Sequence, residues 1–136
     1  MMSGLHLGPL ISCARSGEMA PSEPTDPFVY RFEIYICLRD RLGNQVEAAK
    51  IRQVKDQILR RFGGLTMTSI FGNPIYDGFW KSPKSREVVR DKNSIFTVLA
   101  PQSDETKEYF VAKRKEWEKL LNYEKLLVTV HELQIL

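Results

Sequence analysis

Residues 62–92 read FGGLTMTSIFGNPIYDGFWKSPKSREVVRDK, and this segment decides how the two halves of the chain are joined. Gly63-Gly64 follows a stretch of helical periodicity, and glycine adopts the left-handed conformation that ends many helices at no steric cost. Residues 65–71 (LTMTSIF) are rich in threonine and apolar side chains, which predicts a strand. Gly72-Asn73-Pro74 interrupts this strand, and we expect residues 75–81 to continue it after the break.

The second half of the segment leads into the best candidate for a central strand. Asp77-Gly78 predicts a turn or a bulge, and the composition of residues 82–85 (SPKS) predicts a loop. Strand composition returns in residues 86–90 and, after Asp91-Lys92-Asn93, in residues 94–100 (SIFTVLA). Residues 62–92 therefore predict a helix end, an interrupted strand and the approach to a third strand.

The residues before this segment predict a strand followed by a helix. From Phe28 to Leu38, apolar residues occupy every second position, which indicates a strand with one core face. Asn44 and Glu47 have the spacing of a capping box. Apolar residues then follow at helical spacing: Ile51, Val54, Ile58 and Phe62. We therefore expect a helix over residues 45–62.

The residues after the segment predict a second helix and a last strand. Ser103 is placed to cap the helix, and Asp104 and Glu105 would lie near the positive end of its dipole. Asn122 is the predicted end of the helix. Residues 125–136 (KLLVTVHELQIL) are dense in leucine and β-branched residues, which predicts a strand. The buried stripe of the helix would contain Phe110, Trp117, Leu120 and Leu121.

The predicted order of elements is strand, helix, strand, strand, helix, strand, which is the order of the split βαβ, or ferredoxin-like, unit. Right-handed crossovers would place both helices on one face of a four-stranded antiparallel sheet. We therefore expect an α+β ferredoxin-like sandwich in residues 28–136, preceded by a proline-rich flexible leader over residues 1–27. The sheet face without helices, the open face, would then be free to receive a second subunit or a ligand.

Composition limits the class of protein. Hydrophobic residues make up 43% of the chain and charged residues 27%, which is typical of globular domains. The net charge of +3 is too small for a strongly basic nucleic-acid binder, and no apolar run reaches the roughly 20 residues of a membrane span. The two cysteines, Cys13 and Cys37, do not form a disulfide framework, so we expect a cytoplasmic location. Residues 10–13 (LISC) have the form of a lipoprotein cleavage box, but nothing basic precedes them, which disfavours export through Cys13.

Five short motifs occur in order along the chain: Gly64-Leu65-Thr66, Gly78-Phe79-Trp80, Arg86-Glu87, the apolar strand Ile95–Leu99, and Tyr123-Glu124. In this pattern the sequence resembles a family of small uncharacterised bacterial proteins, some of them lipoproteins. The resemblance spans about residues 30–132. It implies a ferredoxin-like fold and implies no known activity.

The sequence offers no set of residues with the spacing of a catalytic or metal site. Gly63-Gly64 follows a helix, whereas the glycine-rich turn of a nucleotide site precedes one. A metal site would require His131, Cys37 and an acidic residue, Glu33 or Glu132, to meet, and no spacing predicts this. Cys37 and His131 would make a nucleophile pair without an oxyanion donor or an orienting residue. We therefore predict no catalytic residues, no metal and no cofactor.

Polar side chains of the first strand mark the open face as the candidate functional surface. Arg31, Glu33 and Tyr35 alternate, so they project from the same side of the sheet. They would line a pocket together with Trp80, Arg86, Glu87 and His131, although cross-strand pairs in a dimer interface explain the same pattern. The leading hypothesis is a non-enzymatic association or accessory module, with itself as a homodimer or with another protein, acting through this face.

Two alternatives remain open. Lys81–Lys92 contains five basic residues beside Trp80: Lys81, Lys84, Arg86, Arg90 and Lys92. An open sheet with aromatic and basic side chains can stack bases and contact phosphates, so the first alternative is a single-stranded nucleic-acid-binding protein. Against it, SIFTVLA lacks the basic and glycine residues of the RNA-recognition motif. The second alternative is a small-molecule enzyme that uses the face of Arg31, Tyr35 and His131.

Overall fold

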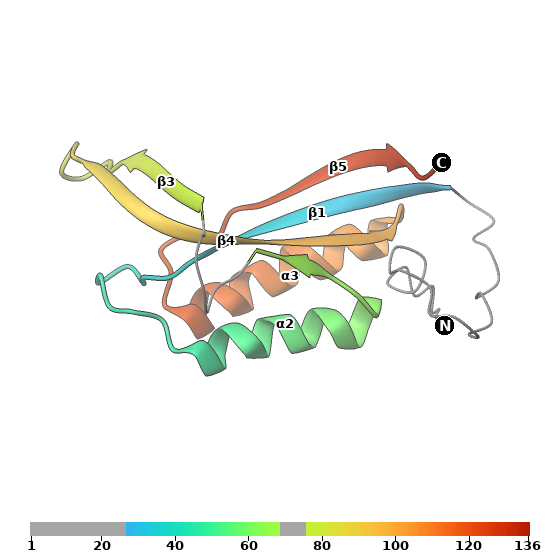
Figure 1. The fold of residues 1–136 in the computed structure, drawn as a ribbon, viewed down its shortest axis with the longest axis horizontal. Coiled ribbons are helices and arrows are strands. Elements are labelled where there is room, and N and C mark those ends of the chain that lie inside the picture. The colour runs from blue at the N-terminus through green and yellow to red at the C-terminus, as the bar shows by residue number, and fades with distance from the viewer. Residues whose placement is uncertain (1–26, 69–75) are drawn as a thin grey trace.

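The structure is a computed structural model that describes residues 27–68 and 76–136. In these residues one antiparallel sheet has the strand order β2-β4-β1-β5, and β3 pairs with a different part of β4. Both helices cover the same face of the sheet (Figure 1). The elements are β1 Phe28–Cys37, α2 Ala48–Phe62, β2 Thr66–Met67, β3 Tyr76–Lys81, β4 Val88–Pro101, α3 Asp104–Leu121 and β5 Val128–Gln134.

The α+β class, the antiparallel sheet and the pair of helices are confirmed, but the predicted number of four strands is wrong. The described sheet has five strands, because the predicted interrupted strand forms two. Thr66 of β2 pairs with Thr97, whereas Tyr76 of β3 pairs with Asn93. The predicted break at Gly72-Asn73-Pro74 and nearly all of the predicted leader lie outside the described residues.

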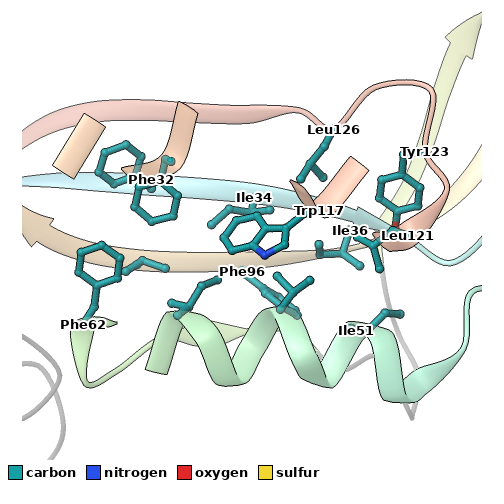
Figure 2. Close-up of a cluster of buried hydrophobic side chains, with 14 of the residues drawn as sticks. Phe32, Ile34, Ile36, Ile51, Phe62, Phe96, Trp117, Leu121, Tyr123 and Leu126 are labelled. Carbon is teal, nitrogen blue, oxygen red and sulfur yellow. The ribbon is translucent and has the colours of Figure 1, made fainter. Parts of the chain in front are cut away.

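The core lies between the sheet and the helices, as the alternation in β1 predicts. Tyr30, Phe32, Ile34 and Ile36 are all buried on the helix side. The aromatic ring of Phe110 stacks on that of Phe32 at 4.1 Å between centroids. Trp117 is among the largest fully buried side chains and lies between sheet and α2 in Figure 2. Its indole N–H donates to Gln57 Oε1 at 3.0 Å, which satisfies the polar atom of a buried aromatic residue.

Three helix ends follow the sequence prediction. Gly63 ends α2 in the left-handed conformation at φ 81°, and its N–H donates to the carbonyl of Leu59. Ser103 caps α3 by accepting from the Thr106 N–H at 3.1 Å. Asn122 ends α3 with φ 56°. Each end is therefore set by a residue that tolerates non-helical geometry or supplies a hydrogen bond.

The predicted capping box at Asn44 is wrong. The helix α2 begins three residues later than expected, and Glu47 precedes it without a side-chain cap. Asn44 instead belongs to a turn, where its N–H donates to Asp40 Oδ1 at 3.0 Å and its carbonyl accepts from the Asp40 N–H at 2.8 Å. The carboxylate of Asp40 thus competes successfully for the backbone donors of this turn.

The predicted interruptions at Asp77-Gly78 and at Asp91-Lys92-Asn93 are also wrong. β4 is a continuous strand of 14 residues, and Gly78 pairs with Asp91 within an unbroken ladder. A side chain at Gly78 would place its Cβ 2.3 Å from Asn93 Nδ2, so glycine here permits close packing rather than a turn. β4 stays extended because it pairs with β3 over its first half and with β1 over its second half.

Residues 76–92 form a two-stranded arm that extends beyond the end of β1 (Figure 1). Its turn is closed by the Ser82 N–H donating to the Glu87 carbonyl at 2.9 Å and the Arg86 N–H donating to the Ser82 carbonyl at 2.8 Å. The last strand begins at Val128 rather than at residue 125, since Leu126 packs into the core. None of the described helices has the length and apolar character needed to cross a membrane.

Candidate ligand site on the open sheet face

The register of the strands brings several polar residues together on the open face, which no described helix or strand covers (Figure 1). Residues of β1 with odd numbers point away from the helices. Arg31 lies between Leu99 of β4 and His131 of β5, and Glu33 lies between Thr97 and Thr129.

A shallow hollow opens on this face at the junction of β1, β4 and β2. Its volume is about 240 Å³, somewhat below the usual range of small-molecule pockets, so it would hold part of a ligand rather than enclose all of it. The lining combines one carboxylate, several hydroxyl groups, an aromatic ring and apolar side chains: Glu33, Thr66, Met67, Thr68, Tyr76, Ile95 and Thr97.

One wall of the hollow is fixed by a buried hydrogen-bond network around Thr68. The fully buried hydroxyl of Ser94 donates to the Thr68 carbonyl at 2.7 Å and lies 2.9 Å from Thr68 Oγ1. Thr68 Oγ1 also accepts from the Ile95 N–H at 3.0 Å. These bonds extend the pairing between β2 and β4 beyond the two paired residues of β2. Thr68 is thereby held in place at the edge of the hollow.

Glu33 and His131 approach each other on the open face and form an ion pair only when the histidine is protonated. His131 Nε2 lies 3.7 Å from Glu33 Oε1, and the histidine side chain is 52% exposed. Two polar atoms beside this pair, Arg31 Nε and Thr129 Oγ1, are buried and have no hydrogen-bond partner among the described residues. Buried polar atoms of native proteins are nearly always hydrogen-bonded, so these two atoms are candidates for a contact that the described residues do not supply.

Cys37 and His131 do not form a nucleophile pair. His131 lies opposite Arg31, six residues along β1 from Cys37, which corresponds to about 20 Å. Burial, together with the nearby charge of Asp91, raises the pKa of the Cys37 thiol to about 11. The thiol donates to Asn93 Oδ1 at 3.0 Å. Cys37 is therefore a protonated, structural side chain at neutral pH.

The predicted site residues fall into two groups. The first lies over the main sheet and contains Arg31, Glu33, Tyr35 and His131. The second lies on the arm of residues 76–92 and contains Trp80, Lys81, Lys84, Arg86, Glu87 and Arg90. Of the residues expected to line one pocket, Trp80, Arg86 and Glu87 therefore do not join Arg31.

On the arm, Trp80 and Arg90 are engaged with acidic neighbours. The Trp80 indole N–H donates to Asp91 Oδ2 at 2.8 Å, while 46% of the residue stays exposed. Arg90 pairs with Asp77 at 3.1 Å and lies 6.0 Å from the ring centroid of Phe79. Trp80 and Arg90 belong to adjacent rungs of the ladder and hence lie on opposite faces of the arm.

Sequence reasoning missed the residues that line the hollow with Glu33. Two signals point to them in retrospect. Thr66 and Thr68 alternate in LTMTSIF, and Thr97 interrupts the apolar run SIFTVLA, so all three are polar residues within segments predicted to be strands. Only the register shows that Thr66 and Glu33 both lie beside Thr97. Among the described residues, no three His, Cys, Asp or Glu side chains form a cluster that could hold a metal ion.

Comparisons with known proteins show that the fold of this chain is similar to that of a solved structure. No protein family and no curated protein matches this chain. The chain is similar to a solved structure of a phage SAM lyase in complex with S-methyl-5′-thioadenosine, with a TM-score of 0.61 and 16% sequence identity. The likeness covers 85% of this chain and 89% of the lyase chain.

This likeness contradicts the leading hypothesis of a non-enzymatic association module, since the structure of the same fold is that of an enzyme holding a small molecule. The small-molecule alternative agrees better with it. Dimerisation and protein interaction gain no support from the fold. The chain has an α+β fold similar to that of the phage SAM lyase.

Proposed function

We propose that this protein is a small-molecule enzyme and that it binds an adenosine derivative with sulfur at the 5′ position in the hollow of the open face. The observation that carries the proposal is the fold shared, over most of both chains, with a lyase that holds S-methyl-5′-thioadenosine. The hollow supports the proposal because it lies on a face that no described element covers.

The lining of the hollow suits a nucleoside. Hydroxyl groups of Thr66 and Thr97 and the carboxylate of Glu33 can exchange hydrogen bonds with ribose hydroxyls. Tyr76 and Ile95 offer an aromatic ring and an apolar side chain to a planar base. A volume of about 240 Å³ fits one such unit, with the rest of the ligand lying along the sheet.

The chemistry of the ligand class explains why no nucleophile is needed. S-adenosylmethionine (SAM) differs from S-methyl-5′-thioadenosine by an aminocarboxypropyl group on a positively charged sulfur. When the bond from this group to sulfur breaks, its electron pair stays on sulfur and gives a neutral thioether, so the leaving group takes up no proton. A lyase uses neither water nor an oxidant, so the carbon must regain an electron pair from within the substrate. A carboxylate oxygen of the aminocarboxypropyl group can form a new C–O bond to the carbon that leaves sulfur, which gives a lactone and the neutral thioether. The protein then contributes positioning and electrostatics, and Glu33 would attract the sulfonium charge.

Several finer predictions belong to this proposal. We assign the sheet to the ferredoxin-like type, with β2 and β3 sharing the place of its second strand. The cytoplasmic location, the resemblance to the small bacterial family and the predicted partners, whether a second copy, another protein or a nucleic acid, stay predictions.

The proposal is tested by incubating the purified protein with SAM and measuring S-methyl-5′-thioadenosine by chromatography, with a protein-free blank for spontaneous breakdown. We expect formation above the blank, a loss of this activity in Thr97→Arg, which fills the hollow, and a reduction of about tenfold or more in Glu33→Gln. Glu116→Gln on α3, whose exposed carboxylate lies on the helix side, is the matched control and keeps full activity. No product above the blank, together with no binding of either nucleoside, would overturn the proposal.

A further inference from the structure

Arg31 is a partly buried cation, and the part of the chain that the structure describes supplies no counter-charge to it. Its Nε is buried and has no hydrogen-bond partner, and no carboxylate among the described residues comes within 4.0 Å of its guanidinium. Arg61, Arg90 and Arg114, by contrast, each lie within 3.7 Å of a carboxylate oxygen. A buried donor on a charged group that lacks an acceptor is costly, so this arrangement destabilises the protein when nothing is bound.

The surroundings of Arg31 favour an anion over water as its neighbour. Leu99 lies beside it on β4, and Val29 and Leu133 form the next pair along the same face, so apolar side chains limit access of water. His131 on β5 lies opposite Arg31, and the nearest acidic residue of β1, Glu33, is paired with that histidine. Glu33 Oε1 thus lies beside His131, and no contact within 4.0 Å joins it to Arg31.

Thr129 supplies a second donor at the same place. It lies opposite Glu33 and hence diagonal to Arg31 across the β1–β5 pair, within reach of a long side chain. Its Oγ1 is buried and has no partner among the described residues. Arg31 and Thr129 thus offer an N–H and an O–H that both lack an acceptor, and a carboxylate has two oxygens that accept such bonds.

We propose that Arg31 and Thr129 form a subsite for the carboxylate of the amino-acid part of the ligand. The inference rests on the proposed function, because it places the nucleoside in the neighbouring hollow. Arg31 is two residues from Glu33 along β1, which corresponds to about 7 Å. The chain of three carbons that joins the sulfur of SAM to its carboxylate spans a comparable distance. The site therefore holds the carboxylate-bearing sulfonium more tightly than the thioether product, which has lost this contact.

The test compares two neutral-sulfur ligands by isothermal titration calorimetry. S-adenosylhomocysteine carries the amino-acid carboxylate, and S-methyl-5′-thioadenosine lacks it. Arg31→Met keeps an apolar stem and removes the guanidinium, so we expect affinity for S-adenosylhomocysteine to fall about ten- to a hundredfold while affinity for S-methyl-5′-thioadenosine changes less than about twofold. Arg31→Lys restores part of the loss, because it retains the charge without the planar fork. Arg114→Met, on α3, is the control and changes neither affinity.

The outcomes separate the subsite from the proposed function. If the wild-type protein binds neither ligand, the proposed function fails. If it binds both and Arg31→Met changes neither affinity, or lowers both equally, the subsite is wrong. The melting temperature gives a further check, since removal of an unpaired cation is expected to leave it unchanged or raised. If Arg31→Met does not fold, the same two affinities are measured for Arg31→Lys and Thr129→Val, which keep the volume of the side chain. A fall in affinity for S-adenosylhomocysteine alone supports the subsite, and equal or absent changes refute it.

Discussion

The substitution Ser94→Ala tests whether the buried network around Thr68 holds the wall of the hollow. Ser94 is fully buried, and its hydroxyl donates to the Thr68 carbonyl at 2.7 Å and contacts Thr68 Oγ1 at 2.9 Å. Alanine removes both contacts and leaves the carbonyl without this donor. A buried group that loses its partner costs roughly 1–3 kcal/mol, so we expect the free energy of unfolding to fall by about 2 kcal/mol. For a folded unit of this size, the melting temperature would fall by roughly 8 °C.

The assay is urea denaturation followed by tryptophan fluorescence, because Trp117 is buried in the core. Ser85→Ala is the matched control. Ser85 is exposed in the turn of the arm, where its hydroxyl accepts from the Glu87 N–H, so the same chemical change is expected to cost less than about 0.5 kcal/mol. Equal effects of the two substitutions, or a Ser94→Ala protein as stable as the wild type, would refute the assigned role of the network.

Three further predictions concern the ends of the helices and the buried thiol. Gly63→Ala, at φ 81°, is expected to lower the free energy of unfolding by about 1 kcal/mol in denaturant titration, and an unchanged value would contradict the left-handed end of α2. Ser103→Ala removes the hydrogen bond to the Thr106 N–H and is expected to cost about 1 kcal/mol, whereas no loss in the same titration would show that the cap is dispensable. Burial and the charge of Asp91 raise the pKa of the Cys37 thiol from 9.0 to about 11, so the folded state favours the protonated thiol. The free energy of unfolding is therefore expected to fall as the pH rises from about 9 to 11. In a Cys13→Ser background, iodoacetamide is expected to modify Cys37 at pH 8 far more slowly than in urea, and equal rates would argue against the raised pKa.

The elements that are set by short-range sequence patterns could be predicted from the sequence. The alternation of Phe28–Leu38 gives β1 and its core face, and helical spacing gives the four buried residues of α2: Ile51, Val54, Ile58 and Phe62. Three helix ends are set by single residues: Gly63 and Asn122 adopt the left-handed conformation, and the Ser103 hydroxyl accepts a backbone hydrogen bond. These effects are local, so they can be predicted without knowledge of the tertiary structure.

The two errors have different causes, one within a local turn and one in the pairing of distant strands. Asn44 has the spacing of a cap, but the carboxylate of Asp40 takes up its N–H in a turn. Asp77-Gly78 has the composition of a turn, but pairing with β4 keeps it extended, and the close approach of Asn93 explains the glycine. At Asn44 a competing local turn outweighs the capping box, and at Asp77-Gly78 pairing with a distant strand outweighs the turn preference.

The open face was partly predictable. Period-two alternation places Arg31, Glu33 and Tyr35 on one side of β1, and this follows from the sequence alone. The hollow does not, because it depends on the register that brings Thr66 and Glu33 to the two sides of Thr97. The lack of a partner for Arg31 Nε among residues 27–68 and 76–136 likewise cannot be predicted from the sequence, since it depends on where the fold places the side chains of Glu33 and His131.

The central claim is that the hollow on the open face binds the nucleoside. It is tested most directly by titrating ¹⁵N-labelled protein with S-methyl-5′-thioadenosine and following the backbone amide resonances. We expect saturable shifts of the amide resonances of three residues that line the hollow, Thr66, Ile95 and Thr97, and little change along the outer surface of α3. Absence of shifts at millimolar ligand, or shifts confined to the arm of residues 76–92 or to the helices, would contradict it.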